Sequence, residues 1–269
     1  MSATLQVPGL GRVHFDPRSR EETEFLIKEI FADRSYLRHG IEIAPGAVIL
    51  DAGANIGLFT LFAKQETKGE LTVLAFEPVP SIFRYLEKNM AEHGLGDRVR
   101  LFCAGLGRAA GSASFSWFPG LPANSTQSLE DKLHQLRAFK EASLAALRME
   151  HPILYPLLAP AAAARLDTLM EHEEVECPVR TIAEAVEEAG LERIDLLKID
   201  TEGAELDILD GIGEPLWKNV RQVVLETHGA RAQIIEARLR SAGFDRIAVE
   251  RPEFAARLGL DNFNLYARR

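Results

Sequence analysis

The stretch that decides the fold is AVILDAGANIG, residues 47–57. Its first half is an apolar run that follows a Pro-Gly break and ends in an acid, which is typical of a buried parallel strand. Its second half is rich in glycine and leads into a helical pattern from about Ile56. Backbone amides in such a turn, and those at the N-terminus of the next helix, are expected to face a ligand. The stretch therefore predicts a strand, a ligand-binding turn and a helix.

Short apolar strands alternate with helical patterns along most of the chain. After the turn we expect strands at 71–77, 99–103, 194–200, 222–226, 244–249 and 262–267. Helical patterns occur at 82–90, 181–189, 204–209 and 232–242. This order predicts an α/β fold with a mostly parallel sheet covered by helices on both faces. The last two strands lack a convincing helix between them and Pro252 interrupts their connection, so we expect an antiparallel final strand in a seven-stranded sheet.

Two segments fall outside this alternation. Residues 1–45 carry a strand pattern at 11–15 and a helical pattern, and we interpret them as an N-terminal cap on a single domain at 46–269. Residues 119–164 interrupt that domain as an insertion, which begins as a loop and continues as a mostly polar helix at 129–149. Long insertions between core elements are often functional. The inserted helix is either a solvated spacer or a lid over a pocket.

Charge and composition exclude several classes of protein. The formal net charge is −9, which repels a phosphate backbone, and no basic stripe overrides that field, so nucleic acid is not an expected partner. No apolar stretch approaches the roughly 20 residues that span a bilayer, and residues 1–4 do not begin a signal peptide. We therefore expect a cytoplasmic protein without a membrane partner. Its two cysteines, Cys103 and Cys177, are far apart and are predicted to be reduced and structural.

The turn itself is the first candidate site. Gly53 and Gly57 allow a sharp turn and a close approach to a ligand that a Cβ would obstruct. Ala54 and Asn55 lie between them and are predicted to contact the same ligand. Asp51, at the end of the strand, suits a ligand that bears an amino group and a sulfonium, because a carboxylate attracts both cations. The alternative is that Asp51 only caps the helix and the glycines only turn the chain.

Glu77 ends the next strand and adds a second carboxylate to this site. At the tip of a second strand a carboxylate can accept hydrogen bonds from ribose hydroxyls, as in dinucleotide sites. The ligand is then a nicotinamide dinucleotide or S-adenosylmethionine. The dinucleotide fingerprint requires glycine where this chain has Asp51, whose charge would repel a pyrophosphate. The residues therefore favour S-adenosylmethionine as the cofactor.

A second acidic edge follows the apolar strand in LLKIDTEGAE, residues 196–205. Asp200 and Glu202 follow this strand, and Glu226 and His228 end the next one. Ligands of doubly wound folds bind beyond the carboxyl ends of the strands, so these side chains are expected near the cofactor. Histidine is the usual general base near neutral pH, and a neighbouring carboxylate would orient it. We predict catalytic roles for His228, Asp200 and Glu226, and contact with the acceptor for Glu202.

The spacing at this edge leaves other interpretations open. Asp200, Glu226 and His228 could ligate a divalent cation that binds the acceptor oxygen. A metal-free base is favoured because catalytic metal sites usually show more ligand candidates. His228 could also be an inert loop residue, and Asp200 a helix cap. His39 precedes the first core strand and could contact the substrate from the cap, or it could be a surface residue.

Taken together, these motifs resemble the FkbM family of methyltransferases over roughly residues 35–267. The resemblance is carried by residues 48–60, by AFEP at 75–78, by NST at 124–126, by residues 198–205 and by LETH at 225–228. It implies a class I methyltransferase fold of Rossmann-like type. It also implies methyl transfer to a hydroxyl or carboxyl oxygen, often on polyketide, nonribosomal-peptide or sugar scaffolds. On this resemblance Asp51, Gly53, Asn55, Gly57 and Glu77 would hold the cofactor, and Asp200, Glu226 and His228 would face the acceptor.

The acceptor is left less defined than the cofactor. The insertion, with its NST stretch at 124–126, is similar to family members encoded with or inside assembly-line synthases, which favours a small or carrier-protein-bound metabolite of secondary metabolism. Two rival functions use the same architecture. An NAD-dependent oxidoreductase is disfavoured by Asp51, and a non-catalytic nucleotide-binding module is disfavoured by the ordered acids at 200, 202 and 226.

Overall fold

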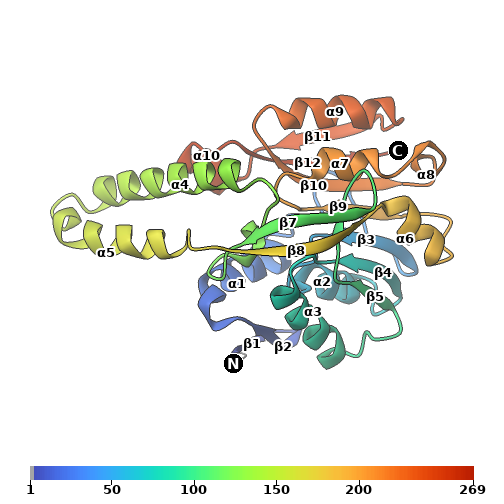
Figure 1. Ribbon diagram of the computed structural model, residues 1–269, viewed down its shortest axis with the longest axis horizontal. Helices are drawn as coiled ribbons and strands as arrows, with labels where there is room; N and C mark the ends of the chain where they lie inside the picture. Colours follow the sequence, from blue (N-terminus) through green and yellow to red (C-terminus); the bar gives the residue numbers. More distant parts are fainter. Residues whose placement is uncertain (1–2) are drawn as a thin grey trace.

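A twisted seven-stranded sheet forms the centre of the protein (Figure 1), seen in a computed structural model that describes residues 3–269. Met1 and Ser2, the start of the predicted cap, lie outside this range. The strand order is β11-β12-β10-β9-β3-β4-β5. The strands are β3 (Ala47–Ala52), β4 (Leu71–Phe76), β5 (Val99–Phe102), β9 (Leu196–Ile199), β10 (Gln222–His228), β11 (Arg246–Glu250) and β12 (Asn262–Arg268). Only β12 runs against its neighbours in this sheet, which confirms the predicted seven-stranded, mostly parallel fold with an antiparallel final strand.

Helices cover both faces of this sheet. They include α2 (Leu58–Glu66), α3 (Pro80–Glu92), α6 (Ile182–Glu188), α7 (Glu205–Asp210), α8 (Glu214–Trp217) and α9 (Arg231–Ser241). Ile49 of β3 and Val73 of β4 belong to the hydrophobic cluster of α2 and α3, whereas their neighbours Leu50 and Leu74 belong to that of α6, α7 and α9. Successive residues of a strand point to opposite faces. A strand buried on both faces must therefore be apolar throughout, as β3 is.

Among the short helices that were not predicted from the sequence, one lies in the connection between the last two strands. It is α10 (Glu253–Leu258), which lies between β11 and β12. Pro252 was expected only to interrupt the connection, but it occupies the N-cap of this helix. Proline is compatible with the beginning of a helix because the first amides have no partner within the helix.

The N-terminal segment forms a hairpin followed by a helix. The hairpin consists of β1 (Ala3–Val7) and β2 (Gly11–Phe15). After a 3-10 turn (Pro17–Ser19), α1 (Arg20–Ile27) continues into a π-helical turn (Lys28–Ala32). Asn89 of α3 accepts a hydrogen bond from the His14 amide at 2.7 Å and donates one to the His14 carbonyl at 3.0 Å. This exchange attaches β2 to the core.

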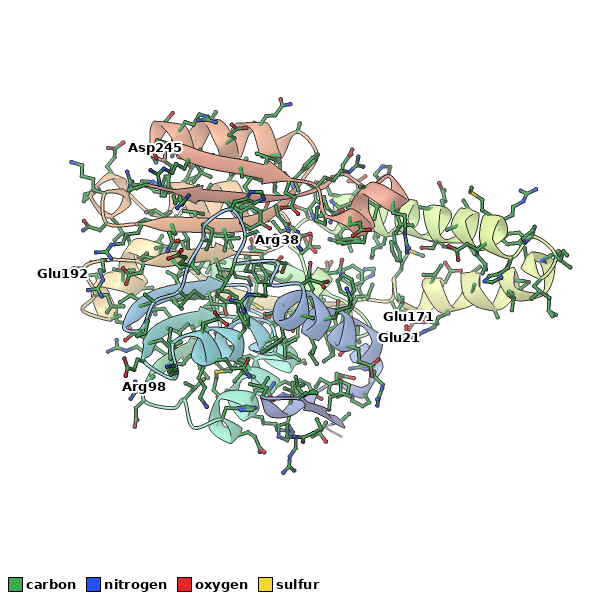
Figure 2. All side chains as sticks on the ribbon, turned by 180° about the vertical axis from the view of Figure 1, so that it is seen from behind. Glu21, Arg38, Arg98, Glu171, Glu192 and Asp245 are labelled. Carbon is green, nitrogen blue, oxygen red and sulfur yellow. The ribbon has the colours of Figure 1, made fainter. Side chains whose placement is uncertain are left out.

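The predicted insertion contains a helical hairpin that projects from the body (Figure 1). It is formed by α4 (Leu129–Glu150) and α5 (Tyr155–Thr168). Its base joins a three-stranded sheet of β6 (Gly105–Leu106), β7 (Gly111–Trp117) and β8 (Glu173–Arg180). Glu21 of α1 forms an ion pair with Arg165 of α5, and Figure 2 shows Glu21 beside the base of the hairpin. Within residues 3–269, no helix combines the length and apolarity needed to cross a membrane.

The two ends of this hairpin differ in burial. Near the base of α4, Lys132 and Leu136 are buried. Near the tip, Met149, Ile153 and Leu157 are 83%, 91% and 77% exposed. The hairpin is therefore held to the body at its base.

Candidate active site

The turn after β3 adopts the backbone conformation that its glycines predict. Gly53 and Gly57 have φ values of +75° and +91°, which L-residues adopt at a cost. A Cβ on Gly53 would lie 1.9 Å from the Asp200 carbonyl oxygen, and one on Gly57 would lie 2.5 Å from Met90 Cε. The atoms that an added Cβ would meet belong to the protein itself. We had expected the Cβ to obstruct a ligand instead. Glycine at 53 lets the turn pack directly against the chain that follows β9.

The backbone amides of this turn differ from the prediction. They were expected to face a ligand, but the amides of Gly53 and Ala54 both donate to the Phe76 carbonyl, at 3.0 and 2.8 Å. The Asn55 amide donates to Glu77 Oε2 at 3.0 Å, and the Gly57 amide donates to the Ala54 carbonyl. The protein therefore satisfies these donors internally, because the turn packs against the end of β4.

Asp51 is completely buried beneath the turn. Its Oδ2 accepts a hydrogen bond from Thr60 at 2.9 Å, and its Oδ1 lies 3.1 Å from Lys198 Nζ. The same ammonium donates to the Gly53 carbonyl at 2.7 Å. Burial lowers the pKa of Lys198, but the charges of Asp51 and Asp200 outweigh it and raise the pKa overall. The carboxylate of Asp51 is therefore paired within the protein, and Lys198 connects it to the turn.

Glu77 presents a buried carboxyl group at the end of β4. It accepts hydrogen bonds from the amides of Asn55 and Val79, both at 3.0 Å. Burial raises the pKa of Glu77 to about 7, although these amides favour the ionised form. Asn55 has a φ of +50°, and its buried Oδ1 has no hydrogen-bond partner in residues 3–269. Buried polar atoms are rarely left unpaired, so this oxygen is available to a donor on a bound ligand.

A pocket lies at the carboxyl ends of β3, β4 and β9. Its polar wall includes Gly53, Ala54, Asn55, Glu77, Lys198 and Asp200. Its other walls come from α1 and the residues after it, from β7 and from residues 122–127 at the start of the insertion. Four of the predicted cofactor residues thus share one pocket. Asp51 and Gly57 are not part of its lining, and neither is any residue of α4 or α5.

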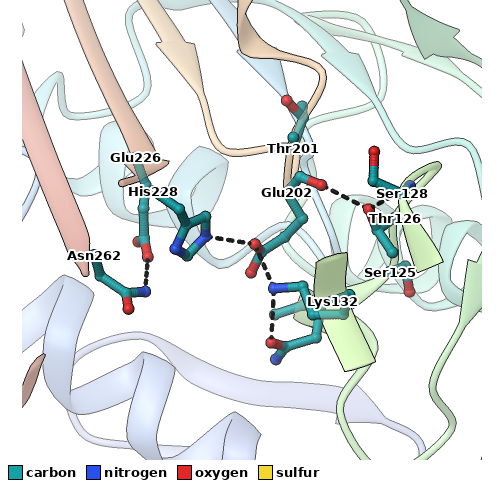
Figure 3. Close-up of polar contacts among 12 residues, drawn as sticks. Ser125, Thr126, Ser128, Lys132, Thr201, Glu202, Glu226, His228 and Asn262 are labelled. Atoms are coloured by element: carbon teal, nitrogen blue, oxygen red, sulfur yellow. Dashed lines mark hydrogen bonds and ion pairs between the residues drawn. The ribbon is translucent and has the colours of Figure 1, made fainter. Parts of the chain in front are cut away.

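The predicted catalytic residues lie at the ends of neighbouring strands, with Asp200 directly after β9 and Glu226 and His228 in β10, but they have different partners. Asp200 accepts a hydrogen bond from the Tyr36 hydroxyl at 2.7 Å. Glu226 accepts one from Asn262 at 3.0 Å. His228 contacts Glu202, with 2.9 Å between Nε2 and Oε2 (Figure 3). The carboxylate that orients His228 is therefore Glu202, not Asp200 or Glu226.

Glu202 carries two partners on a single oxygen. Besides His228, its Oε2 contacts Lys132 Nζ at 2.6 Å (Figure 3). Burial raises the pKa of Glu202, but the Lys132 charge and the His228 contact outweigh it and lower the pKa to about 2. Lys132 belongs to the inserted helix α4, and sequence reasoning missed it. A buried lysine on a mostly polar helix has no pattern that separates it from its exposed neighbours.

Two further acids are shifted in the opposite direction. Burial, followed by the charges of Asp200, Glu202 and Glu29, raises the pKa of Glu226 well above its usual range. Burial raises the pKa of Glu29 to about 7, and the charge of Asp200 acts in the same direction. Burial and the neighbouring acids therefore disfavour the ionised form of Glu226. Groups with strongly shifted pKa values cluster at functional sites.

His39 is not brought to this pocket. Its Nε2 contacts Glu250 Oε2 at 2.7 Å, and its ring lies 4.9 Å from that of Tyr266. These contacts place it beside β11 and β12, and His39 is not among the residues that line the pocket.

Asp200, Glu226 and His228 do not converge on a common point. Across residues 3–269, no group of three or more His, Cys, Asp and Glu side chains is arranged to hold a metal ion. The three side chains instead bond to Tyr36, Asn262 and Glu202, respectively.

Comparison with known proteins connects this geometry to one family. A family model described as the methyltransferase FkbM domain matches residues 51–246. The chain is 38% identical over 237 residues to 31-O-demethyl-FK506 methyltransferase FkbM of Streptomyces tacrolimicus, covering 87% of this chain and 86% of that protein. It is 36% identical over 253 residues to AMB antimetabolite synthetase AmbE of Pseudomonas aeruginosa, covering 91% of this chain and 12% of the synthetase.

A solved structure is similar to this fold. It is the crystal structure of methyltransferase FkbM from Methylobacillus flagellatus KT, with a TM-score of 0.52 and 15% sequence identity. The match covers 86% of this chain and 46% of that chain. At this identity the likeness shows the fold alone.

Proposed function

Because the chain belongs to the FkbM family of methyltransferases, we propose that it uses S-adenosylmethionine to methylate a hydroxyl or carboxyl oxygen of a metabolite. The observation that carries the proposal is that one pocket is lined by both Glu77, which ends in a carboxyl group, and Asn55, whose Oδ1 has no hydrogen-bond partner in residues 3–269. The Glu77 carboxylate and the Asn55 amide oxygen are hydrogen-bond acceptors. They can pair with the hydroxyl and amino groups of S-adenosylmethionine.

The residues of the turn would hold the cofactor in distinct ways. Glu77 would accept hydrogen bonds from ribose hydroxyls, and Asn55 Oδ1 would accept one from an amino or hydroxyl group. Asp51 acts from behind the wall, because it fixes Lys198 and through it the Gly53 carbonyl. When bound, S-adenosylmethionine would supply a methyl group carried on a positively charged sulfur. After the transfer, this sulfur would be part of a neutral thioether.

We propose that His228, which contacts Glu202 and lies outside the pocket lining, takes the acceptor's proton. With its pKa near 2, Glu202 is an ionised carboxylate that can only accept hydrogen bonds at neutral pH. In the proposed reactive form, His228 Nε2 donates its hydrogen to Glu202 and Nδ1 of the neutral ring holds a lone pair. Nδ1 would take the hydroxyl proton as the acceptor oxygen bonds to the methyl group. A positioned base of this kind contributes about 10²–10⁴-fold in rate.

We propose a small or carrier-protein-bound metabolite of secondary metabolism as the acceptor. The relative AmbE supports this proposal, because its matching segment is 12% of a much longer synthetase. Pro122, Ala123, Ser125 and Gln127, at the start of the insertion, line the pocket and would contact the acceptor.

Isothermal titration calorimetry tests the cofactor assignment. Separate titrations with S-adenosylmethionine, S-adenosylhomocysteine and NAD are expected to show binding of the first two only. Binding of NAD alone would refute the proposal. Methyl transfer from labelled S-adenosylmethionine to a panel of hydroxylated and carboxylated metabolites, free and carrier-bound, then tests the acceptor.

A further inference from the structure

We propose that Lys132, in the first turn of the inserted helix α4, is a positioning residue for His228. It holds the Glu202 carboxylate against the imidazole and thereby keeps Nδ1 available to take a proton. The inference rests on the proposed function, because it assigns Lys132 a part in that reaction.

The first support is the burial of a lysine on a helix that is otherwise solvated. The Lys132 side chain is only 4% exposed, and the side chains of Glu202 and His228 are 11% and 12% exposed. Lysine is almost never fully buried unless it is paired, because the desolvation of its charge is costly. Leu136 is the only other buried residue of α4. The helix therefore directs its one buried cation at the group that orients the histidine.

The second support is the network that fixes Lys132 in place. Lys132 Nζ lies 3.3 Å from Asn124 Oδ1, and the Asn124 side-chain amide donates to Glu22 of α1 at 3.2 Å. Thr126 Oγ1 donates to the Glu202 carbonyl at 2.6 Å. The NST stretch at 124–126 thus contacts both Lys132 and the backbone of Glu202. This gives the stretch a structural role that the sequence could not assign.

The third support is the charge balance around the imidazole. The charged groups that face His228 from other elements are Glu202, Glu205 at the start of α7 and, across Glu202, Lys132. Two acids without Lys132 would favour a doubly protonated imidazolium, whose Nδ1 cannot accept a proton. The ammonium offsets this negative charge. Lys132 thereby opposes protonation of Nδ1, while Glu202 still fixes the orientation of the ring.

Nuclear magnetic resonance of the histidine Cε1–H groups tests this inference without an acceptor. The His228 signal is identified by its absence in H228N. In K132M the midpoint of the His228 titration is expected to rise by about 0.5–1.5 pH units relative to the wild type, because a neighbouring positive charge is lost. K132R should restore most of the wild-type midpoint. The matched control is K140M on the same helix, because Lys140 pairs with Asp167 far from His228.

A folded K132M protein whose His228 titration matches the wild type would overturn the inference. If K132M does not fold, E202Q provides the second test, because it removes the central charge and should lower the midpoint instead. An unchanged midpoint in folded E202Q would also overturn the inference.

Calorimetry with S-adenosylhomocysteine separates the two proposals, because absence of binding by the wild type refutes the proposed function and leaves the titration result intact. Once an acceptor is known, K132M should lower kcat and shift the acidic limb of the rate profile to higher pH, with the KM for the cofactor unchanged.

Discussion

The two sides of the active-site region are built differently. On the cofactor side, Asp51, Glu77 and Lys198 are held by β3, β4 and β9 and by the turns that follow them. On the acceptor side, the carboxylate that orients His228 is shared with Lys132 from the insertion. The first side is part of the α/β core, whereas the second is completed by a segment outside it. On the proposed assignment, the core would provide the cofactor site and the insertion would position His228, the proposed general base.

The largest effect is expected on the cofactor side, at Gly53. In Gly53→Ala the new Cβ would overlap the Asp200 carbonyl oxygen, which is backbone and cannot move freely. We expect a loss of about 3–5 kcal/mol in the free energy of unfolding, measured by urea denaturation. Gly46→Ala is the control, because Gly46 has a φ of +79° and no atom within 4 Å of the added Cβ. It should cost only about 1–2 kcal/mol, and equal losses in both variants would contradict the packing argument.

The next effect is expected on the acceptor side, at His228. His228→Ala should lower turnover by about 10²–10⁴-fold while the affinity for S-adenosylmethionine stays nearly constant. His39→Ala is the matched control and should change turnover little, since His39 pairs with Glu250. Chelators should leave the wild type active. Activity lost in EDTA and restored by Mg²⁺ or Mn²⁺ would instead make Asp200, Glu226 and His228 metal ligands.

The same division explains what the sequence could and could not predict. Residues 47–57 predicted the first core strand and its turn because a doubly buried strand and a glycine turn both leave local signals. The antiparallel final strand was also predicted. The contacts of Lys132 and Lys198 were missed. Their partners lie far away in the sequence, and local patterns do not indicate them. Helix α5 was missed as well, because it buries none of its residues and contains Pro160.

A smaller effect is expected from Glu77, where it also depends on pH. Glu77→Ala should weaken S-adenosylmethionine binding, since each hydrogen bond to an ionised carboxylate contributes about 1.5–3 kcal/mol before non-additivity. Burial raises the Glu77 pKa to about 7, so the ionised acceptor forms as pH rises through that value. Wild-type affinity should therefore increase between pH 6 and pH 8. Glu77→Gln cannot ionise and should lose this dependence, whereas a pH response that persists in Glu77→Gln would exclude Glu77 as its source.

The smallest effect is expected from the outer part of the helical hairpin. Replacing residues 142–164 by a short turn removes the exposed tip but keeps Lys132 and Leu136 at the base. No residue of α4 or α5 lines the pocket, and the hairpin points away from the body (Figure 1). Binding of S-adenosylhomocysteine should therefore change by less than about twofold, and the His228 titration should match the wild type.

Turnover separates the two interpretations of the inserted helix. In one interpretation, only the end of the hairpin that carries Lys132 acts on the site. The shortened protein should then methylate a small acceptor at close to the wild-type rate, whereas K132M should be slower by about tenfold or more. A shortened protein that binds S-adenosylhomocysteine normally but has lost turnover would establish the outer hairpin as a lid. Its motion would then have to close over a pocket that it does not contact in this structure.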